Sequence, residues 1–369
     1  MKIGIITLPT RTNYGGILQA YALSKVLQSM GHNPYTIYIP IKWKLKWYKK
    51  PYVYLKRFLK KMFHKATIIF LEDKLNKEYP IVSRNTWKFV KENIPYLIKN
   101  KYCDIKESEF DCLVVGSDQI WRPQYISSGI ECAYLDFAKE WNIKRIAYAV
   151  SFGTDQWEYT PKQTNECNKL IHLFDKVSVR EKSAISMCQK YYSITPVHVL
   201  DPTLLLDKED YTIFCGNNDD NYNGDILNYI LDWDYNKTET IAYLEKTLKL
   251  KSFKVNSLFE DCTATIEERI QPSVEQWITG FKHAKIVITD SFHACVFSII
   301  FNKPFYVIGN AERGMSRFYS LLSIFNLENR LIKSYQEISM NDSINWEKVN
   351  KRRIELQKAS IEFLKKSLS

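Results

Sequence analysis

Three polar residues stand at the start of a long apolar run. Asp290, Ser291 and His293 follow the β-branched segment 284–289, and residues 294–301 continue as an apolar stretch that is typical of a buried helix. A strand that leads into a helix presents such residues where open α/β sheets bind anions. An imidazole at that point could transfer a proton to or from an anionic ligand. The sequence leaves equally open that Asp290 or Ser291 only caps the helix and that His293 is structural.

Other candidate groups also follow short apolar strands. They are Asn13, Gly15 and Gly16 in a polar loop after residues 3–6, Asp118 after 112–115, and Arg180 after 177–179. The fork of an arginine suits bidentate binding of a carboxylate or phosphate, and adjacent glycines let a ligand approach the backbone. Asp118 is a candidate general base, although a loop or helix cap explains it equally well. The glycine pair matches neither a dinucleotide fingerprint nor a Walker loop.

Two further arginines follow a later strand. Arg313 and Arg317 come after the apolar run 304–308, and either could add positive charge to the same site. The alternative for each is an ordinary surface ion pair. We expect one of the two to face the ligand, and the sequence does not say which.

Five segments in this order resemble the polysaccharide pyruvyl transferase family. They are residues 1–38, 111–121, 177–181, 199–205 and 290–305, so that the resemblance extends over roughly residues 1 to 330. It implies two Rossmann-like α/β domains facing a cleft, a GT-B-like fold, and transfer of the enolpyruvyl unit of phosphoenolpyruvate to a sugar, with a pyruvate ketal as product. It also associates His293 and Arg180 with the phosphoenolpyruvate site. Ala294 and Cys295 depart from the frequent pattern, but neither change removes a charged group.

Phosphoenolpyruvate carries a carboxylate and a phosphate, so its site needs fixed cations and helix-terminal N–H groups. We therefore expect His293 as the acid that protonates the methylene carbon and Asp118 as the base. The expected substrate-binding residues are Arg180, Ser291, Arg313, Arg317, Asn13, Gly15 and Gly16. No metal or cofactor beyond the donor substrate is expected, because the eight cysteines show neither a Cys-x-x-Cys pair nor metal-like spacing with histidine.

The positive charge of the chain is concentrated in one segment. Between Lys42 and Lys65 there are ten Lys/Arg and no Asp or Glu, so removing the ten from the net charge of +11 leaves +1. Tryptophan, tyrosine and phenylalanine are interleaved with these cations, which is typical of a segment lying in the headgroups of an anionic membrane. The apolar residues between Tyr54 and Phe63 recur at helical spacing, so a helix packed on the core is the open alternative. Nucleic acid is not an expected partner.

The organisation follows from the alternation of strand and helix patterns. We expect an N-terminal α/β domain over residues 1–200, with a basic-aromatic insertion at 41–66, and a C-terminal α/β domain over 201–369. Its terminal helix, residues 344–368, could pack back on the first domain. Neither a signal peptide nor a spanning apolar run is visible. We expect a cytoplasmic protein, and the basic segment leaves open a peripheral location at the inner face of the membrane.

Two other functions remain open from the sequence alone. A GT-B glycosyltransferase that uses a nucleotide sugar would have the same architecture, because fold alone does not specify chemistry. A non-catalytic, membrane-associated scaffold of a glycan assembly complex would need only the basic segment. The Ser291-Phe292-His293 and Ser178 to Glu181 motifs favour the pyruvyl transferase, with phosphoenolpyruvate and a lipid-linked sugar acceptor as partners. The acceptor sugar and its hydroxyl pair stay open.

Overall fold

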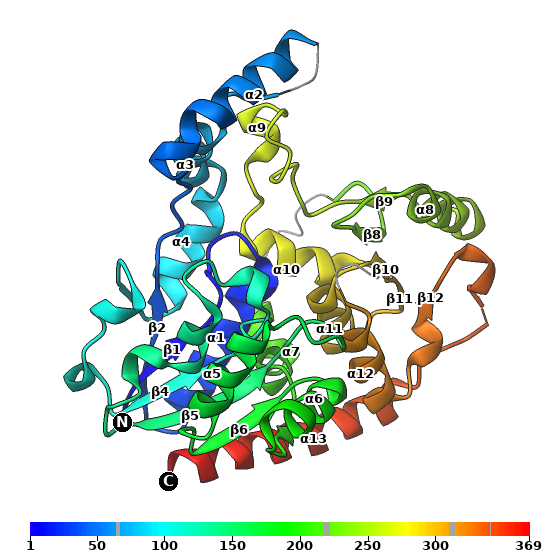
Figure 1. Cartoon of the computed structure of the whole chain (residues 1–369). Helices are drawn as coiled ribbons and strands as arrows, with labels where there is room; N and C mark the ends of the chain where they lie inside the picture. Colours follow the sequence, from blue (N-terminus) through cyan, green and yellow to red (C-terminus); the bar gives the residue numbers. More distant parts are fainter. Residues whose placement is uncertain (64–66, 217–221, 310–313, 340) are drawn as a thin grey trace.

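The computed structural model describes residues 1–63, 67–216, 222–309, 314–339 and 341–369 (Figure 1). These residues form a seven-stranded sheet of order β3-β2-β1-β4-β5-β6-β7 and a five-stranded sheet of order β12-β11-β10-β8-β9. All recorded strand pairs are parallel. The expected α/β class with two Rossmann-like domains is confirmed.

The strands of the first sheet are β1 Lys2–Ile6, β2 Asn33–Tyr38, β3 Tyr96–Ile98, β4 Cys112–Val115, β5 Lys144–Val150, β6 Lys176–Val179 and β7 Val197–His198. Those of the second sheet are β8 Ile226–Tyr229, β9 Ser252–Phe253, β10 Ile286–Thr289, β11 Phe305–Ile308 and β12 Leu331–Ile332. Residues of β4, β8, β10 and β11 are buried throughout. Parallel strands covered on both faces read as continuous apolar runs, which is why the sequence identifies them readily.

The helices are α1 Tyr14–Ser29, α2 Lys50–Met62, α3 Leu71–Val82, α4 Arg84–Asn93, α5 Pro161–Ile171, α6 Lys182–Tyr192, α7 Lys208–Thr212, α8 Tyr235–Leu248, α9 Ile266–Arg269, α10 Val274–His283, α11 Phe292–Ile300, α12 Ser316–Phe325 and α13 Trp346–Leu368. The last helix, α13, runs back along the N-terminal domain (Figure 1). Ser360 Oγ accepts the Leu200 N–H at 3.0 Å, and Gln357 Nε2 donates to the Leu205 carbonyl at 2.7 Å. These bonds attach the end of the chain to the segment between the sheets.

One apolar core is shared by both domains. Tyr211 of α7 is fully buried, and its ring lies 4.8 Å from that of Phe297 on α11 and 6.5 Å from that of Tyr21 on α1. Helices α1 and α11 therefore pack into the same cluster although they belong to different domains. This shared packing sets the relative position of the residues at the amino ends of the two helices.

The first helix begins earlier than the sequence predicts. Gly15 and Gly16 were expected in a loop, because each glycine costs a helix about 1 kcal/mol relative to alanine. In the structure they lie in the first turn of α1, and Asn13 is the N-cap, whose Oδ1 accepts the Gly16 N–H at 3.1 Å. The cap and the tertiary packing of this turn outweigh the low propensity.

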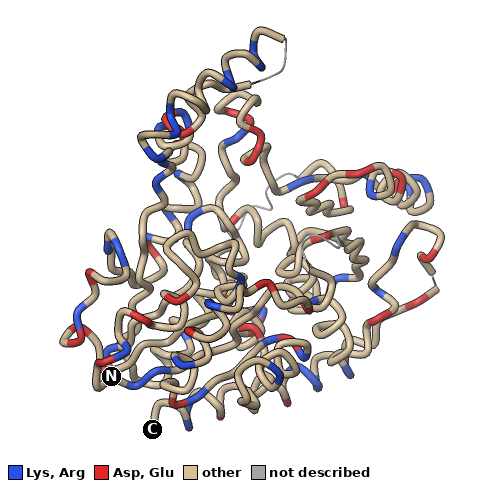
Figure 2. The backbone as a smooth tube through the Cα atoms, viewed as in Figure 1, with Lys and Arg blue, Asp and Glu red and all other residues tan. Residues whose placement is uncertain are grey.

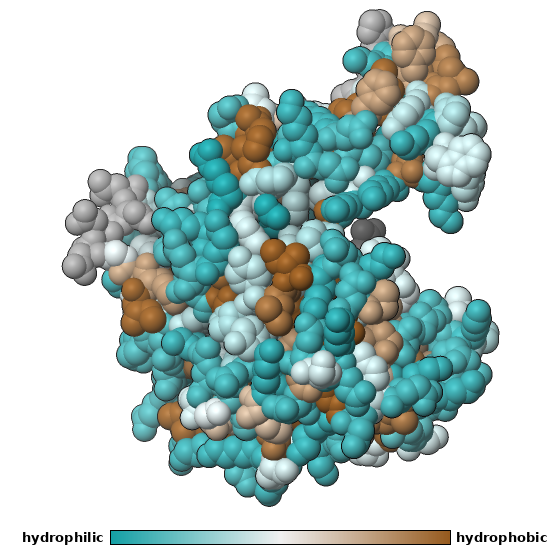
Figure 3. Space-filling model, turned by 90° about the vertical axis from the view of Figure 1, so that its left-hand side faces the viewer, coloured by the Kyte–Doolittle hydropathy of each residue, from teal (hydrophilic) through white to brown (hydrophobic). Residues whose placement is uncertain are grey.

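Residues 42–63, which we call the arm, project from the body of the protein (Figure 1). The arm ends in α2, in which no residue is buried. The alternative of a helix packed on the core is therefore wrong. Figure 3 shows brown and pale side chains gathered on the projection at the top of the molecule, where α2 lies.

Candidate functional site

A pocket of about 620 Å³ lies between the two domains. Its walls come from the segments that follow β1, β4, β8 and β10, and from the chain around α9 and α12. The lining includes residues 12–15, 118–119 and 125 from the first domain and residues 229–231, 233, 254, 256–261, 277, 290–293 and 317 from the second. The carboxyl ends of parallel strands thus meet at one site, as is usual in open α/β sheets.

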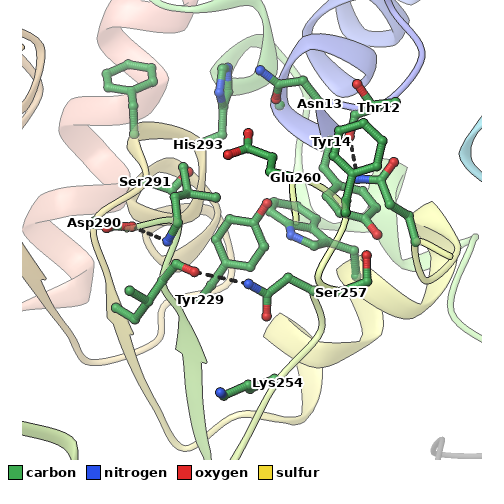
Figure 4. Close-up of a pocket in the computed structure, with 18 of the residues that line it drawn as sticks. Thr12, Asn13, Tyr14, Tyr229, Lys254, Ser257, Glu260, Asp290, Ser291 and His293 are labelled. Atoms are coloured by element: carbon green, nitrogen blue, oxygen red, sulfur yellow. Dashed lines mark hydrogen bonds between the residues drawn. The ribbon is translucent and has the colours of Figure 1, made fainter. Parts of the chain in front are cut away.

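His293 stands in the first turn of α11 and rests on the opposite domain. A Cβ atom at Gly15 would lie only 2.0 Å from His293 Nδ1, so the ring occupies the space that a side chain on α1 would fill. The imidazole is buried, and its Nε2 lies 3.7 Å from Asp201 Oδ2. Figure 4 shows the ring near Asn13, with the carboxylate of Glu260 pointing into the same space. His293 is therefore positioned by both domains.

Asp201 is a functional candidate that the sequence analysis did not single out. Its carboxylate accepts hydrogen bonds from the Thr203 N–H at 3.0 Å and the Thr203 hydroxyl at 2.6 Å. Burial by itself would raise the pKa of Asp201, but contacts with His293, Arg180 and Thr203 outweigh it and lower the pKa. The group is therefore an anion at neutral pH. Its place after a short strand, in the run Asp201-Pro202-Thr203, was the available signal.

Arg180 lies behind the pocket and is not among its lining residues. Its Nη1 contacts Asp201 Oδ2 at 2.7 Å and its Nη2 contacts Asp118 Oδ1 at 3.1 Å, while its side chain is 1% exposed. Burial acts to lower the pKa of Arg180, but the charges of Asp118, Asp201 and Glu181 outweigh it and raise the pKa. Arg180 therefore joins two carboxylates and holds them in place.

Asp118 reaches the pocket from the loop after β4. Its backbone adopts a left-handed conformation with φ of 64°, which aspartate tolerates better than most residues. Its carbonyl accepts the Ser151 N–H at 3.1 Å, so neighbouring chain supports this geometry. The carboxylate lines the pocket, although the residue is only 3% exposed.

Arg317, in the first turn of α12, is the arginine that lines the pocket. Its Cζ lies 5.7 Å from the centre of the Phe292 ring, and Cζ of Arg180 lies 4.6 Å from the same ring. Burial, together with the charge of Arg180, lowers the pKa of Arg317 to about 10, so it stays protonated at neutral pH. The other candidate, Arg313, lies outside the described residues.

The remaining candidates have separate roles. Ser291 lines the pocket as the N-cap residue of α11, and its N–H donates to Thr289 Oγ1 at 2.9 Å. Asp290 also lines the pocket, and it joins the segment after β8 to α8, because its carboxylate accepts the Leu231 N–H at 2.7 Å and lies 3.2 Å from Lys237 Nζ. The structure thus brings His293, Asp118, Ser291, Arg317, Asn13 and Gly15 to one pocket.

Aromatic residues form part of the pocket wall. The sequence did not identify them as candidates. Tyr14 and Trp277 stack with ring centres 5.5 Å apart, and Tyr229 meets Trp277 edge-on at 5.6 Å. Lys254 also lines the pocket, with its Nζ 4.1 Å from the centre of the Trp233 ring. Figure 4 shows Lys254 at the end of the pocket remote from His293. These residues converge from separate segments, and no spacing in the sequence relates them.

Two structural properties concern metals and membranes. Within the described residues, no three His, Cys, Asp or Glu side chains are grouped so that they could hold a metal ion. In the same parts of the chain, no helix has both the length and the apolar character required to span a bilayer.

Several solved structures are similar in fold to this chain. The Arabidopsis thaliana protein UGT89C1, determined in complex with UDP-L-rhamnose, has a TM-score of 0.50 and 9% identity, over 98% of this chain and 97% of that one. A glycosyltransferase from Rickettsia africae has a TM-score of 0.49 and 12% identity, over 100% and 99% of the two chains. The Neisseria meningitidis UDP-GlcNAc 2-epimerase, determined with UDP-GlcNAc, has a TM-score of 0.46 and 11% identity, over 98% and 93%. At 9% identity the likeness to UGT89C1 shows the fold alone.

The sequence comparison is more specific than the comparison of structures. A search of curated proteins found no match. The sequence model of the polysaccharide pyruvyl transferase family, by contrast, matches residues 13–312, a range that contains Asp118, Arg180 and His293. The chain therefore belongs to the polysaccharide pyruvyl transferase family.

Proposed function

We propose that the protein transfers the pyruvyl group of phosphoenolpyruvate to a sugar of a lipid-linked polysaccharide precursor and forms a pyruvate ketal. Membership of the family supports pyruvyl transfer in polysaccharide synthesis. The observation that carries the finer proposal is the position of His293, which is held between Gly15 and Asp201 in the same pocket as Arg317. A proton donor and a fixed cation at one site are the two groups that this donor substrate requires.

In this proposal Arg317 binds the anionic donor directly. The N–H groups of the first turn of α11 assist, because a helix amino terminus favours negative charge. Arg180 was expected in this role from the sequence, but its Nη atoms already contact Asp118 and Asp201. We assign Arg180 to positioning: it orients Asp118 toward the pocket and Asp201 toward His293.

The proposed reaction balances with these groups. His293, protonated, gives its proton to the methylene carbon of phosphoenolpyruvate, and one sugar hydroxyl attacks the adjacent carbon. The proton of that hydroxyl passes to Asp118. A second hydroxyl of the same sugar then displaces phosphate, its proton leaving with the phosphate as hydrogen phosphate, and the Asp118 proton is returned to His293 through solvent. Asp201 holds the ring in position, since its Oδ2 lies 3.7 Å from His293 Nε2.

The acceptor is proposed to lie toward the aromatic side of the pocket. The rings of Tyr229, Trp233 and Trp277 line it, and sugars pack well on such rings because their C–H faces are apolar. Lys254, beside Trp233, would bind an anionic group of the acceptor, such as the phosphate of a lipid-linked glycan.

The role of Arg317 is tested by binding. Arg317→Gln should weaken phosphoenolpyruvate binding by about ten- to a hundred-fold, because one charge-assisted contact contributes roughly 1.5–3 kcal/mol. Isothermal titration calorimetry measures the change. Arg352→Gln is the control, since Arg352 is half-exposed on α13 and forms an ion pair with Glu355. An unchanged affinity in a folded Arg317→Gln protein would contradict the assignment.

The overall reaction is tested with phosphoenolpyruvate and a panel of soluble and lipid-linked glycans. Mass spectrometry should detect a pyruvyl increment on one glycan, together with an equal amount of released phosphate. A nucleotide-sugar glycosyltransferase remains the second candidate only on the likeness of fold, and melting curves separate the two. Phosphoenolpyruvate should raise the melting temperature, because a ligand that binds only the folded state stabilises it. Stabilisation by UDP-sugars alone would favour the glycosyltransferase.

A further inference from the structure

We propose that the arm binds the anionic surface of a membrane through the outward apolar face of α2, and that this binding presents the pocket to a lipid-linked acceptor. The second part rests on the proposed function, whereas the first does not. The arm takes no part in the site just described, since none of its residues lines the pocket.

The apolar face of α2 points away from the protein. The half-buried positions Val53, Tyr54 and Arg57 recur at one side of the helix and pack toward α3. On the opposite side lie the exposed residues Tyr52, Leu55, Phe58, Leu59, Met62 and Phe63. Leu55 is 59% exposed, Met62 61% and Phe63 77%. A helix that served only to cover a core would present these residues inward, so this face is available to an external apolar phase.

The orientation of α2 is set by specific contacts with α3. Arg57 binds Glu72 through two N–H···O bonds of 2.7 and 2.9 Å, and it also donates to the Ile69 carbonyl at 3.1 Å. The hydrogen bonds from Arg57 lower the pKa of Glu72, which keeps the carboxylate ionised. The rings of Tyr54 and Phe70 meet edge-on at 4.9 Å. The side of α2 that faces the protein is therefore held by a bidentate ion pair and a ring contact, and the apolar side is left outward.

The charge of the arm identifies the occupant of this face. The arm carries eight exposed lysines, namely Lys42, Lys44, Lys46, Lys49, Lys50, Lys56, Lys60 and Lys61. Figure 2 shows blue segments along this projection. Lys56 and Lys60 border a shallow groove that Tyr52, Leu55, Leu59 and Phe63 also line. Anionic headgroups would pair with the ammonium groups while the apolar side chains enter the acyl boundary. A second copy of the chain would instead bring two sets of like charges together.

The arm is also connected to the wall of the pocket. Helix α3 packs on the segment 257–269: Lys74 Nζ donates to the Cys262 carbonyl at 2.9 Å, and Arg269 forms an ion pair with Glu78. Residues 258–261 of the same segment line the pocket. A membrane surface bound by α2 would therefore lie beyond the segment that forms one wall of the site, which suits an acceptor attached to a lipid.

The contribution of the arm's positive charge to membrane binding is tested by co-sedimentation. The vesicles contain either phosphatidylcholine alone or phosphatidylcholine with phosphatidylglycerol. The parent protein should pellet with the anionic vesicles only, and less so as salt rises. The triple variant Lys56→Gln, Lys60→Gln, Lys61→Gln should bind about a hundred-fold more weakly, since each basic residue near the surface contributes roughly a five-fold factor. Arg57 is left unchanged because it holds α2 to α3.

The matched control changes the same number of charges elsewhere. Lys351→Gln, Lys358→Gln, Lys365→Gln alters three exposed lysines of α13, at the opposite end of the molecule from α2 (Figure 1). It should bind vesicles as the parent does. Parent protein that does not pellet with anionic vesicles would overturn the proposal, as would an equal loss of binding in the control, which would mean that net charge alone attracts the protein.

A second pair of variants tests the apolar face. Leu55→Ser and Leu59→Ser should each reduce vesicle binding by roughly ten-fold, and circular dichroism should be unchanged because both residues are exposed. Leu173→Ser, which alters a leucine 42% exposed on another surface, should have no effect. A concentration-dependent dimer that Leu59→Ser abolishes would assign the face to a second copy and overturn the lipid proposal. Vesicle binding without turnover of any glycan would refute only the proposed function.

Discussion

His293→Gln is expected to lower kcat for pyruvyl transfer by about a hundred- to ten-thousand-fold while phosphoenolpyruvate still binds. Glutamine approximates the size of imidazole but cannot donate a proton to carbon, and a positioned acid typically contributes this factor. Continuous measurement of phosphate release gives the rate, and calorimetry gives the affinity of the donor. The affinity should change little, because Arg317 remains in place.

The control for this variant is His172→Gln, which changes an exposed histidine outside the pocket. It should have the kcat of the parent. If His293→Gln turned over within a few-fold of the parent rate, His293 would not be the acid. If kcat were retained and only donor affinity fell, its role would be in binding rather than in proton transfer.

Gly15→Ala is the second variant for which we expect a large loss of activity. It tests the contact between Gly15 of one domain and His293 of the other. The new methyl carbon would lie 2.0 Å from His293 Nδ1 and 2.2 Å from its Cγ, so the ring must move. A displacement of about 1 Å at a reacting group can cost a hundred-fold in rate. We therefore expect kcat to fall at least a hundred-fold, although His293 itself is unchanged.

The adjacent Gly16 was expected to bind substrate, but it is not among the residues that line the pocket, so it offers a matched control. A Cβ atom at Gly16 would lie 3.6 Å from Asn13 atoms and 3.8 Å from Asp118 Oδ2, which are ordinary contact distances. Both positions lie in the first turn of α1, so alanine should improve the local helix propensity similarly at each. Gly16→Ala should therefore keep most of the activity, and equal losses in the two variants would point to the helix rather than to His293.

The sequence by itself predicted the fold class and the long buried strands correctly, because parallel strands buried on both faces leave continuous apolar runs. Residues 286–289 and 112–115 are such runs, and the polar residues that follow them were placed at the sheet edge by that logic alone. His293 and Asp118 do line one pocket as a result. Short edge strands such as Val197–His198 and Leu331–Ile332 were missed, because two residues carry too little pattern.

The ion-pair partners of the candidate site residues could not be predicted from the sequence. Arg180, expected as the donor-binding cation, has its Nη atoms bound to Asp118 and Asp201, and Arg317 lines the pocket in its stead. Whether an arginine faces a ligand or a carboxylate depends on which distant segments fold against it. The stack of Tyr14 on Trp277 and the contact of Gly15 with His293 likewise join opposite domains.

The arm shows most clearly which features the local sequence determines and which depend on the tertiary structure. The spacing of Leu55, Leu59 and Met62 determined that α2 would be amphipathic, because helical periodicity is a local property of the chain. It did not determine whether the apolar side would face inward or outward. That was decided by the bonds of Arg57 with Glu72 on α3, which turn the side of α2 that carries Val53, Tyr54 and Arg57 toward the protein. Exposure depends on what the rest of the chain covers, and only the tertiary structure contains that information.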